Sequence, residues 1–120
     1  MSYDVSVFRH ETRLREERYP GEDFFAEAEN LLPFTAEQYA RLHQTLLGQG
    51  FAALGGPRAA ARYERADPFA QALLSDSGLY FTAPFALDCA FEVSMLASEL
   101  TDTGELAKYD PQAGGWEDPA

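Results

Sequence analysis

Residues 70–104 read AQALLSDSGLYFTAPFALDCAFEVSMLASELTDTG and contain the clearest secondary-structure signals in this 120-residue chain. Ala70–Ser75 and Leu79–Ala83 have the length and composition of two short strands. They flank Asp76-Ser77-Gly78, whose glycine can adopt the positive φ that a tight turn requires. The first part of this stretch therefore predicts a β-hairpin.

A long helix is predicted directly after the hairpin. Pro84 precedes it, and the amphipathic pattern runs from Phe85 to about Thr103, where Gly104 ends it. At 100° per residue, one side forms an apolar stripe that should face a sheet. The members of this stripe are Cys89, Val93, Leu96, Ala97 and Leu100.

The opposite side of this helix combines carboxylates with two apolar residues. The carboxylates gather within an arc of about 80° and are Asp88, Glu92, Glu99 and Asp102. Phe91 and Met95 lie beside them, outside the sheet-facing stripe. Two interpretations are open: a solvated surface whose apolar residues are covered by the N-terminal segment or the C-terminal tail, or an acidic docking face for a basic partner.

The remaining elements extend the same pattern in both directions. Tyr3–Phe8 alternates apolar and polar residues, as a strand with one buried face does. Thr35–Gln38 has the form of a capping box and predicts a helix to about Leu47. Further strands are predicted at Phe51–Leu54, Ala60–Arg65 and Leu106–Tyr109. The predicted fold is α+β, with a mixed or antiparallel sheet of about four to six strands and two main helices packed on one face.

The chain has the length of one globular domain, residues 1–120. Residues 9–21 are rich in charge and are expected to be a solvated connection, with or without a helical turn. Glu22–Leu32 is expected to form a short helix that Pro33 stops. Residues 111–120 follow the last strand as a C-terminal tail.

The net charge of −11 is unevenly distributed along the chain. Residues 1–65 hold eight basic and ten acidic residues, whereas 66–120 hold ten acidic residues against Lys108 alone, a net charge of −9. Arg58, Arg62 and Arg65 form a small basic cluster that is too close to acidic neighbours for a nucleic-acid surface. We therefore expect no binding to nucleic acid or to an anionic membrane. A basic protein partner, or simple solubility, is compatible with the charge.

Nothing in the chain predicts export or a cofactor. No apolar run reaches about 18 residues, and the N-terminus lacks the order of a signal peptide, so a cytoplasmic location is expected. Cys89 is the single cysteine, which excludes an internal disulfide and a cysteine-based zinc cage. We expect neither a cofactor nor a metal site.

Candidate catalytic residues are few. His10 ends the first strand and His43 lies on the apolar side of the first long helix, positions typical of boundary residues with satisfied hydrogen bonds. Asp88 and Glu92 are one helical turn apart, but exposed carboxylates are more commonly ionised and solvated than bound to a metal. No phosphate-binding loop or nucleophile motif is present. We therefore predict no catalytic residue.

The last fifteen residues, LAKYDPQAGGWEDPA, combine a strand with a turn. The Asp110 side chain can accept a hydrogen bond from the backbone N–H two residues on, while Pro111 restricts φ at the next position. Turn chemistry does not explain Trp116. Its indole is either buried by folding the tail back over the sheet or helix, or exposed as an anchor for a partner.

Four features together resemble a known group of proteins: a first strand MSYDVSVF, a hairpin ending SGLYFTAPF, an amphipathic helix and a closing LAKYDPQAGGW. The chain resembles small bacterial α+β proteins that are uncharacterised or assigned as immunity proteins of polymorphic toxin systems. The resemblance implies one cytoplasmic domain that blocks a cognate toxin by binding it, without cofactor or catalysis. It implies no role for individual residues.

Three functional hypotheses follow. The first is an acidic, non-enzymatic inhibitor of immunity type whose candidate partner-binding residues are Asp88, Phe91, Glu92, Met95, Glu99, Asp102 and Trp116. The second is a small ligand-binding domain or enzyme with a pocket lined by Tyr3, Tyr63, Tyr80 and His43. The third is a homo-oligomeric structural protein in which Phe91, Met95 and Trp116 meet their symmetry mates.

Overall fold

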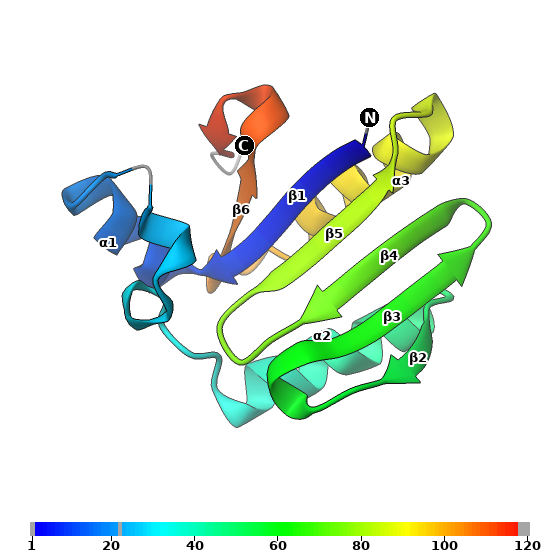
Figure 1. Ribbon diagram of the computed structural model, residues 1–120, viewed down its shortest axis with the longest axis horizontal. Coiled ribbons are helices and arrows are strands. Elements are labelled where there is room, and N and C mark those ends of the chain that lie inside the picture. The colour runs from blue at the N-terminus through cyan, green and yellow to red at the C-terminus, as the bar shows by residue number, and fades with distance from the viewer. Residues whose placement is uncertain (1, 22, 118–120) are drawn as a thin grey trace.

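One antiparallel sheet organises the part of the chain that the structure, a computed structural model, describes: residues 2–21 and 23–117 (Figure 1). The starting residue of the predicted helix Glu22–Leu32 and the last three residues of the predicted tail lie outside the described residues. Within the described part, seven strands follow the order β2-β3-β4-β5-β1-β6-β7, and every neighbouring pair is antiparallel. The strands are β1 Ser2–Arg9, β2 Ala52–Gly55, β3 Ala61–Ala66, β4 Phe69–Leu74, β5 Leu79–Pro84, β6 Leu106–Asp110 and β7 Gly115–Trp116.

The predicted α+β class is confirmed, but the predicted strand count was too low. The additional strand is β7, which pairs Trp116 with Tyr109 and Gly115 with Asp110. A two-residue strand has no period of its own in the sequence, and only its pairing with β6 defines it. The C-terminal tail is thus partly incorporated into the sheet.

Two helices, α2 Ala36–Gly48 and α3 Leu87–Glu99, cover one face of the sheet, as predicted; in Figure 1 both lie behind it. The capping box that starts α2 is present: the Thr35 hydroxyl accepts from the Gln38 N–H at 3.1 Å, and the Gln38 side chain accepts from the Thr35 N–H at 2.9 Å. Helix α3 is shorter than predicted at both ends. Asp102 consequently lies in the turn after the helix, where its N–H donates to the Glu99 carbonyl.

The N-terminal connection is more ordered than the sequence suggested. Helix α1, His10–Arg18, follows β1 directly, and two short 3-10 turns, η1 Phe24–Ala26 and η2 Ala28–Asn30, occupy the segment predicted as one helix. Thr12 is fully buried, and its hydroxyl accepts from the Leu32 N–H at 3.1 Å. Contacts distant in sequence therefore hold a stretch whose charge predicted a solvated connection. The other 3-10 turns are η3 Arg58–Ala60 and η4 Pro111–Ala113.

The main core lies between the sheet and helices α2 and α3. Strand alternation directs Leu79, Phe81 and Ala83 of β5 into it, and all three are almost completely buried. They meet Leu46 of α2 and Val93 of α3, which are fully buried. The period-2 pattern of the strands and the period-3.6 pattern of the helices converge on one apolar layer.

The β4–β5 hairpin is present, but the structural reason for its glycine differs from the one predicted. Gly78 is not among the described residues with positive φ. Instead, a Cβ at this position would lie 2.6 Å from the Tyr80 hydroxyl oxygen and 3.0 Å from Phe8 Cε1. The turn is closed by Ser75, whose hydroxyl accepts from the Gly78 N–H at 3.0 Å. Gly78 is required because neighbouring rings approach the backbone closely.

Candidate protein-docking face

Helix α3 has the two sides that the sequence predicted. Cys89, Val93, Leu96 and Ala97 are buried against the sheet. On the other side Phe91 is 60% exposed and Met95 is 45% exposed. The predicted carboxylates are all exposed: Asp88, Glu92 and Glu99 on the helix and Asp102 in the turn that follows. We use the name docking face for these six residues, Asp88, Phe91, Glu92, Met95, Glu99 and Asp102.

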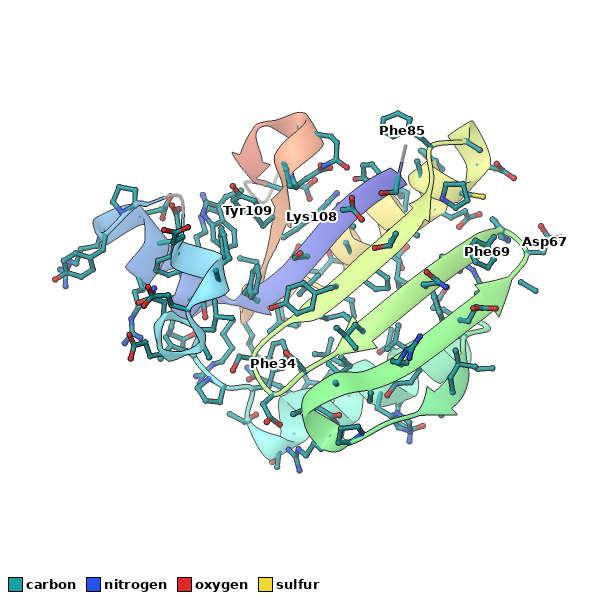
Figure 2. All side chains as sticks on the ribbon, viewed as in Figure 1. Phe34, Asp67, Phe69, Phe85, Lys108 and Tyr109 are labelled. Atoms are coloured by element: carbon teal, nitrogen blue, oxygen red, sulfur yellow. The ribbon has the colours of Figure 1, made fainter. Side chains whose placement is uncertain are left out.

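An apolar groove of about 610 Å³ adjoins the docking face and shares Phe91 with it. Helix α3 forms one wall, and the ends of β1 and β6 with η4 form the rest. Phe85, which is 57% exposed, lies at the groove beside Phe91, and Figure 2 shows it projecting outward from the β5–α3 connection. The lining residues are Tyr3, Phe85, Ala86, Ala90, Phe91, Ser94, Asp110, Gln112 and Ala113.

The sequence pattern predicts Phe85 inside the helix and gives no sign of its contribution to this groove. Because the helix begins two residues later, Phe85 lies in the connection and packs edge-on against Tyr3 with ring centroids 6.2 Å apart. Pro84 was predicted to lie between the hairpin and the helix. It is the last residue of β5.

A hydrogen-bonded pair fixes one side of the groove. The Tyr3 hydroxyl donates to Asp110 Oδ2 at 2.5 Å, and the backbone N–H groups of Gln112 and Ala113 donate to Asp110 Oδ1 at 3.0 and 3.3 Å. The predicted turn role of Asp110 is thus confirmed. Burial of Tyr3, together with the Asp110 carboxylate, raises the pKa of Tyr3 to about 12. Both groups are already paired, so the groove offers shape and apolar surface rather than a reactive group.

The docking face is negative because the single basic residue of the C-terminal half is used internally. Lys108 of β6 (Figure 2) has a side chain that is only 3% exposed. Its ammonium donates to Ser94, to Ser98 and to the Glu117 carboxylate at 3.0 Å. On the α2 side, Arg41 is paired with Glu105 at 2.9 Å. Neither Lys108 nor Arg41 therefore pairs with a carboxylate of the docking face, and these carboxylates keep the face negative.

Trp116 is not part of the docking face. Its half-buried ring packs against Phe8, Phe25 and Tyr109, with centroid distances of 6.0, 5.9 and 5.0 Å. Its Nε1–H donates to Glu16 of α1 at 2.9 Å. Phe8 points to the sheet face opposite α3, so the tail has folded back over the sheet, the first of the two predicted alternatives. The sequence placed Trp116 with Phe91 and Met95, but the structure separates them.

The predicted tyrosine–histidine pocket does not exist as one site. Tyr3 lines the groove beside α3, whereas Tyr80 packs against Phe8 on the other face of the sheet with ring centroids 5.7 Å apart. Tyr63 and His43 do meet, because the Tyr63 hydroxyl lies 2.7 Å from His43 Nδ1. Residues on successive positions of one strand point to opposite faces, and that alternation separates Tyr80 from the core-facing residues.

Comparison of the chain with protein families, curated proteins and solved structures found no match in any of the three. Across residues 2–21 and 23–117, no helix combines the length and apolar character needed to cross a membrane. In that same part of the chain, no three His, Cys, Asp or Glu side chains are grouped as a metal site requires.

Proposed function

We propose that this protein is a non-enzymatic protein-binding module, an acidic inhibitor of immunity type that binds a basic surface of a cognate bacterial toxin. The observation that carries the proposal is the joint exposure of Phe91 and Met95 within a carboxylate rim, next to an apolar groove. Isolated exposed apolar residues are ordinary, but an exposed aromatic residue that lines a groove and has an exposed methionine on the same side of the helix is typical of an interface centre.

Charge supports a basic partner. Four carboxylates lie on the same side of α3 and its following turn as the apolar residues, and the only basic residue in the same half of the chain is buried. Complementary charge accelerates the encounter and excludes wrong partners, while apolar anchors slow dissociation. A toxin that acts on an anionic substrate, such as a nuclease, has the required basic cleft.

The same charge opposes self-association through this face. Two copies that met here would bring like carboxylates together, which is unfavourable by several kcal/mol in a close contact. Trp116, the third apolar residue of the oligomer hypothesis, lies on the other face of the sheet against Phe8. Both observations favour a different, basic protein as the occupant.

The test compares three baits in affinity capture from cells that express the genes neighbouring this one. They are the wild-type protein, the docking-face variant Glu92→Lys/Glu99→Lys and a control variant, Glu27→Lys/Glu29→Lys. All four glutamates are exposed, and the two variants carry the same net charge. We expect one basic protein to be captured by the wild type and the control, and to be lost from the docking-face variant.

Two outcomes would overturn the proposal. Equal capture by all three folded baits would show that the partner binds elsewhere, and the absence of any basic partner would remove the inhibitor role. Phe91→Ala adds an independent measurement, because truncating a central aromatic anchor should raise the dissociation rate by roughly tenfold or more. The melting temperature should change little, since Phe91 is 60% exposed.

A further inference from the structure

Strand β2 forms one edge of the sheet (Figure 1). It pairs with β3 on one side, and within residues 2–21 and 23–117 no strand pairs with its other side. Successive residues of a strand direct their backbone N–H and C=O groups alternately to its two sides. Part of the β2 backbone is therefore open to a further strand, and all four residues of β2 are exposed.

This edge lacks the charged residues and the internal proline with which proteins usually protect an edge strand. Residues 44–57, QTLLGQGFAALGGP, hold no charged residue, and Pro57 follows β2 without interrupting it. The strand is short and has a bulge between Ala53 and Gly55, so only a short added strand can pair with it. The edge therefore fits an extended peptide segment better than another large sheet.

A cavity of about 440 Å³ lies between α2 and the β2–β3 pair, beneath this edge. Ala53 pairs with Tyr63, whose buried side chain faces α2, so Ala53 faces α2 as well. Ala53 contributes a methyl group to the cavity and is exposed, and Gly55 has no side chain. An inward side chain of a strand added to β2 would enter the space that these small residues leave.

Aromatic rings form the opposite wall of this cavity. Tyr39 and His43 lie on the same side of α2, and Tyr63 of β3 meets them. The two tyrosine hydroxyls already have partners: that of Tyr39 donates to the Arg58 carbonyl at 2.9 Å, and that of Tyr63 lies 2.7 Å from His43 Nδ1. The cavity thus offers rings and methyl groups, which favours a large apolar side chain over a polar one.

The charge around β2 is opposite in sign to that of the whole protein. Residues 36–66, which include α2, β2 and β3, hold four arginines and two glutamates, a net charge of +2 in a chain of −11. Arg62 pairs with Gly55 and is exposed on the sheet face opposite α2. Among the described residues it has no ion-pair partner within 4 Å. Because Gly55 has no side chain, the Arg62 guanidinium can reach across it to a carboxylate on an added strand.

A second copy of this chain fits the edge less well. Two paired β2 strands would bring two positively charged segments together and would direct only alanine methyl groups toward the cavities. Strands of this length also bury little surface compared with the roughly 1,200–2,000 Å² of a stable interface. Charge and shape both favour a different, acidic chain.

We propose that β2 binds an extended acidic segment of another protein as an added strand of the sheet. A large apolar side chain of that segment enters the cavity on the α2 side, and a carboxylate on the other side pairs with Arg62. Backbone hydrogen bonds to β2 supply affinity, and the alternating side chains supply specificity. The site is at the opposite edge of the sheet from β6 and β7, and it does not depend on the proposed inhibitor function.

The experiment titrates the ¹⁵N-labelled full chain with the peptide acetyl-Thr-Glu-Phe-Glu-Thr-amide. Strand alternation directs its phenylalanine to one face and both glutamates to the other. We expect saturable amide shifts at Ala52–Gly55 at peptide concentrations up to about 10 mM. Hydrogen exchange of β2 amides should slow in the complex, because new backbone hydrogen bonds form. Absence of saturable shifts at β2, or unchanged exchange in the saturated complex, would overturn the proposal.

Two further peptides test the side-chain requirements. Replacing the phenylalanine with alanine should weaken binding by roughly tenfold or more, because the cavity is left unfilled. Replacing both glutamates with glutamine should weaken it by several-fold, and salt should reduce this difference. Equal affinity of the alanine peptide would overturn the role of the cavity, and equal affinity of the glutamine peptide would overturn the acidic partner.

Neighbouring alanines provide matched variants of the protein. Ala53→Leu fills the cavity from β2 itself and should weaken binding of the phenylalanine peptide by roughly tenfold. Ala52→Leu makes the same change on the other face, since Ala52 pairs with Glu64, and should bind as the wild type does. Both alanines are exposed, so both variants should fold. Equal binding by the two variants would contradict the proposed direction of the side chain.

Charge and self-association complete the test. Arg62→Gln should lose the preference for the glutamate peptide over the glutamine peptide, whereas Arg18→Gln, at an exposed position in α1, should keep it. The same preference in both variants would overturn the role of Arg62. In light scattering of the free protein, a mass that doubles with concentration and returns to the monomer with peptide would assign the edge to a second copy and overturn the proposal.

Discussion

The Tyr3–Asp110 pair provides the sharpest test of how this fold is held together around its groove. Tyr3 is 6% exposed, and its hydroxyl donates to a carboxylate that is also 6% exposed. Substituting Tyr3→Phe removes the donor and keeps the ring. At neutral pH it leaves one oxygen of a buried carboxylate without its partner, so we expect the free energy of unfolding to fall by about 1–3 kcal/mol.

The pH dependence gives a more specific result. Burial and the neighbouring Asp110 raise the Tyr3 pKa from its ordinary value of 10.0 to about 12. A raised tyrosine pKa means that the folded state keeps a proton that the unfolded state loses above pH 10. Stability is therefore fully present below pH 10 and decreases as the pH rises toward 12. From pH 9 to pH 11 the linkage relation predicts that Tyr3 contributes a loss of about 1 kcal/mol.

Urea unfolding of the wild type and of Tyr3→Phe at pH 9 and pH 11 measures this contribution. Other tyrosines with a raised pKa, such as Tyr63 and Tyr80, affect both proteins equally. The difference in the free energy of unfolding between the two proteins should thus shrink by about 1 kcal/mol over this range. An unchanged difference would refute the reasoning, because Tyr3 would then titrate alike in the folded and unfolded states.

Three further substitutions test other parts of the structure, each by urea unfolding. Gly56→Ala should destabilise the fold by about 1–3 kcal/mol, because a Cβ would lie 2.6 Å from a backbone oxygen at a φ of +107°; wild-type stability would contradict this. Thr35→Ala should lower stability by about 1 kcal/mol through loss of the α2 cap, and no loss would mean that the capping box does not stabilise the fold. Desolvation raises the pKa of the Glu117 carboxyl, but hydrogen bonds from Ser98 and Lys108 outweigh it and hold this pKa below the ordinary 4.5. The stability that this carboxylate contributes is present above pH 4.5 and is lost as the pH falls below it, so Glu117→Gln should weaken the acid dependence, and an identical acid dependence would count against the Lys108 contact.

Local patterns were sufficient to predict most of the elements. Strand alternation in β1 and β5, the Thr35 capping box and the two sides of α3 each depend on residues close together in the chain. The local hydrogen bonds and hydrophobic periodicity that these patterns indicate do not depend on the rest of the fold. For the same reason the position of Phe91 and Met95 outside the sheet-facing stripe could be predicted, since one helix has only one sheet-facing side. Whether another segment covers these two residues could not be predicted.

Contacts between distant segments could not be predicted in this way. Strand β7 exists because Trp116 pairs with Tyr109, and helix α1 is anchored by Thr12 through a bond to Leu32. Gly78 was correctly identified as a turn glycine, but for the wrong reason. Glycine is needed at this position because the Tyr80 and Phe8 side chains approach the backbone closely. No local sequence pattern predicts that approach.

The sequence by itself determined that this chain is an acidic α+β protein with an amphipathic helix whose outer side combines carboxylates with Phe91 and Met95. Only the tertiary structure decided which of these residues meet. It buried Lys108, joined Phe85 and Phe91 at one groove and placed Trp116 on the opposite face of the sheet. The reason is that periodicity fixes the direction of a side chain relative to its own element, whereas strand order and helix placement determine its neighbours.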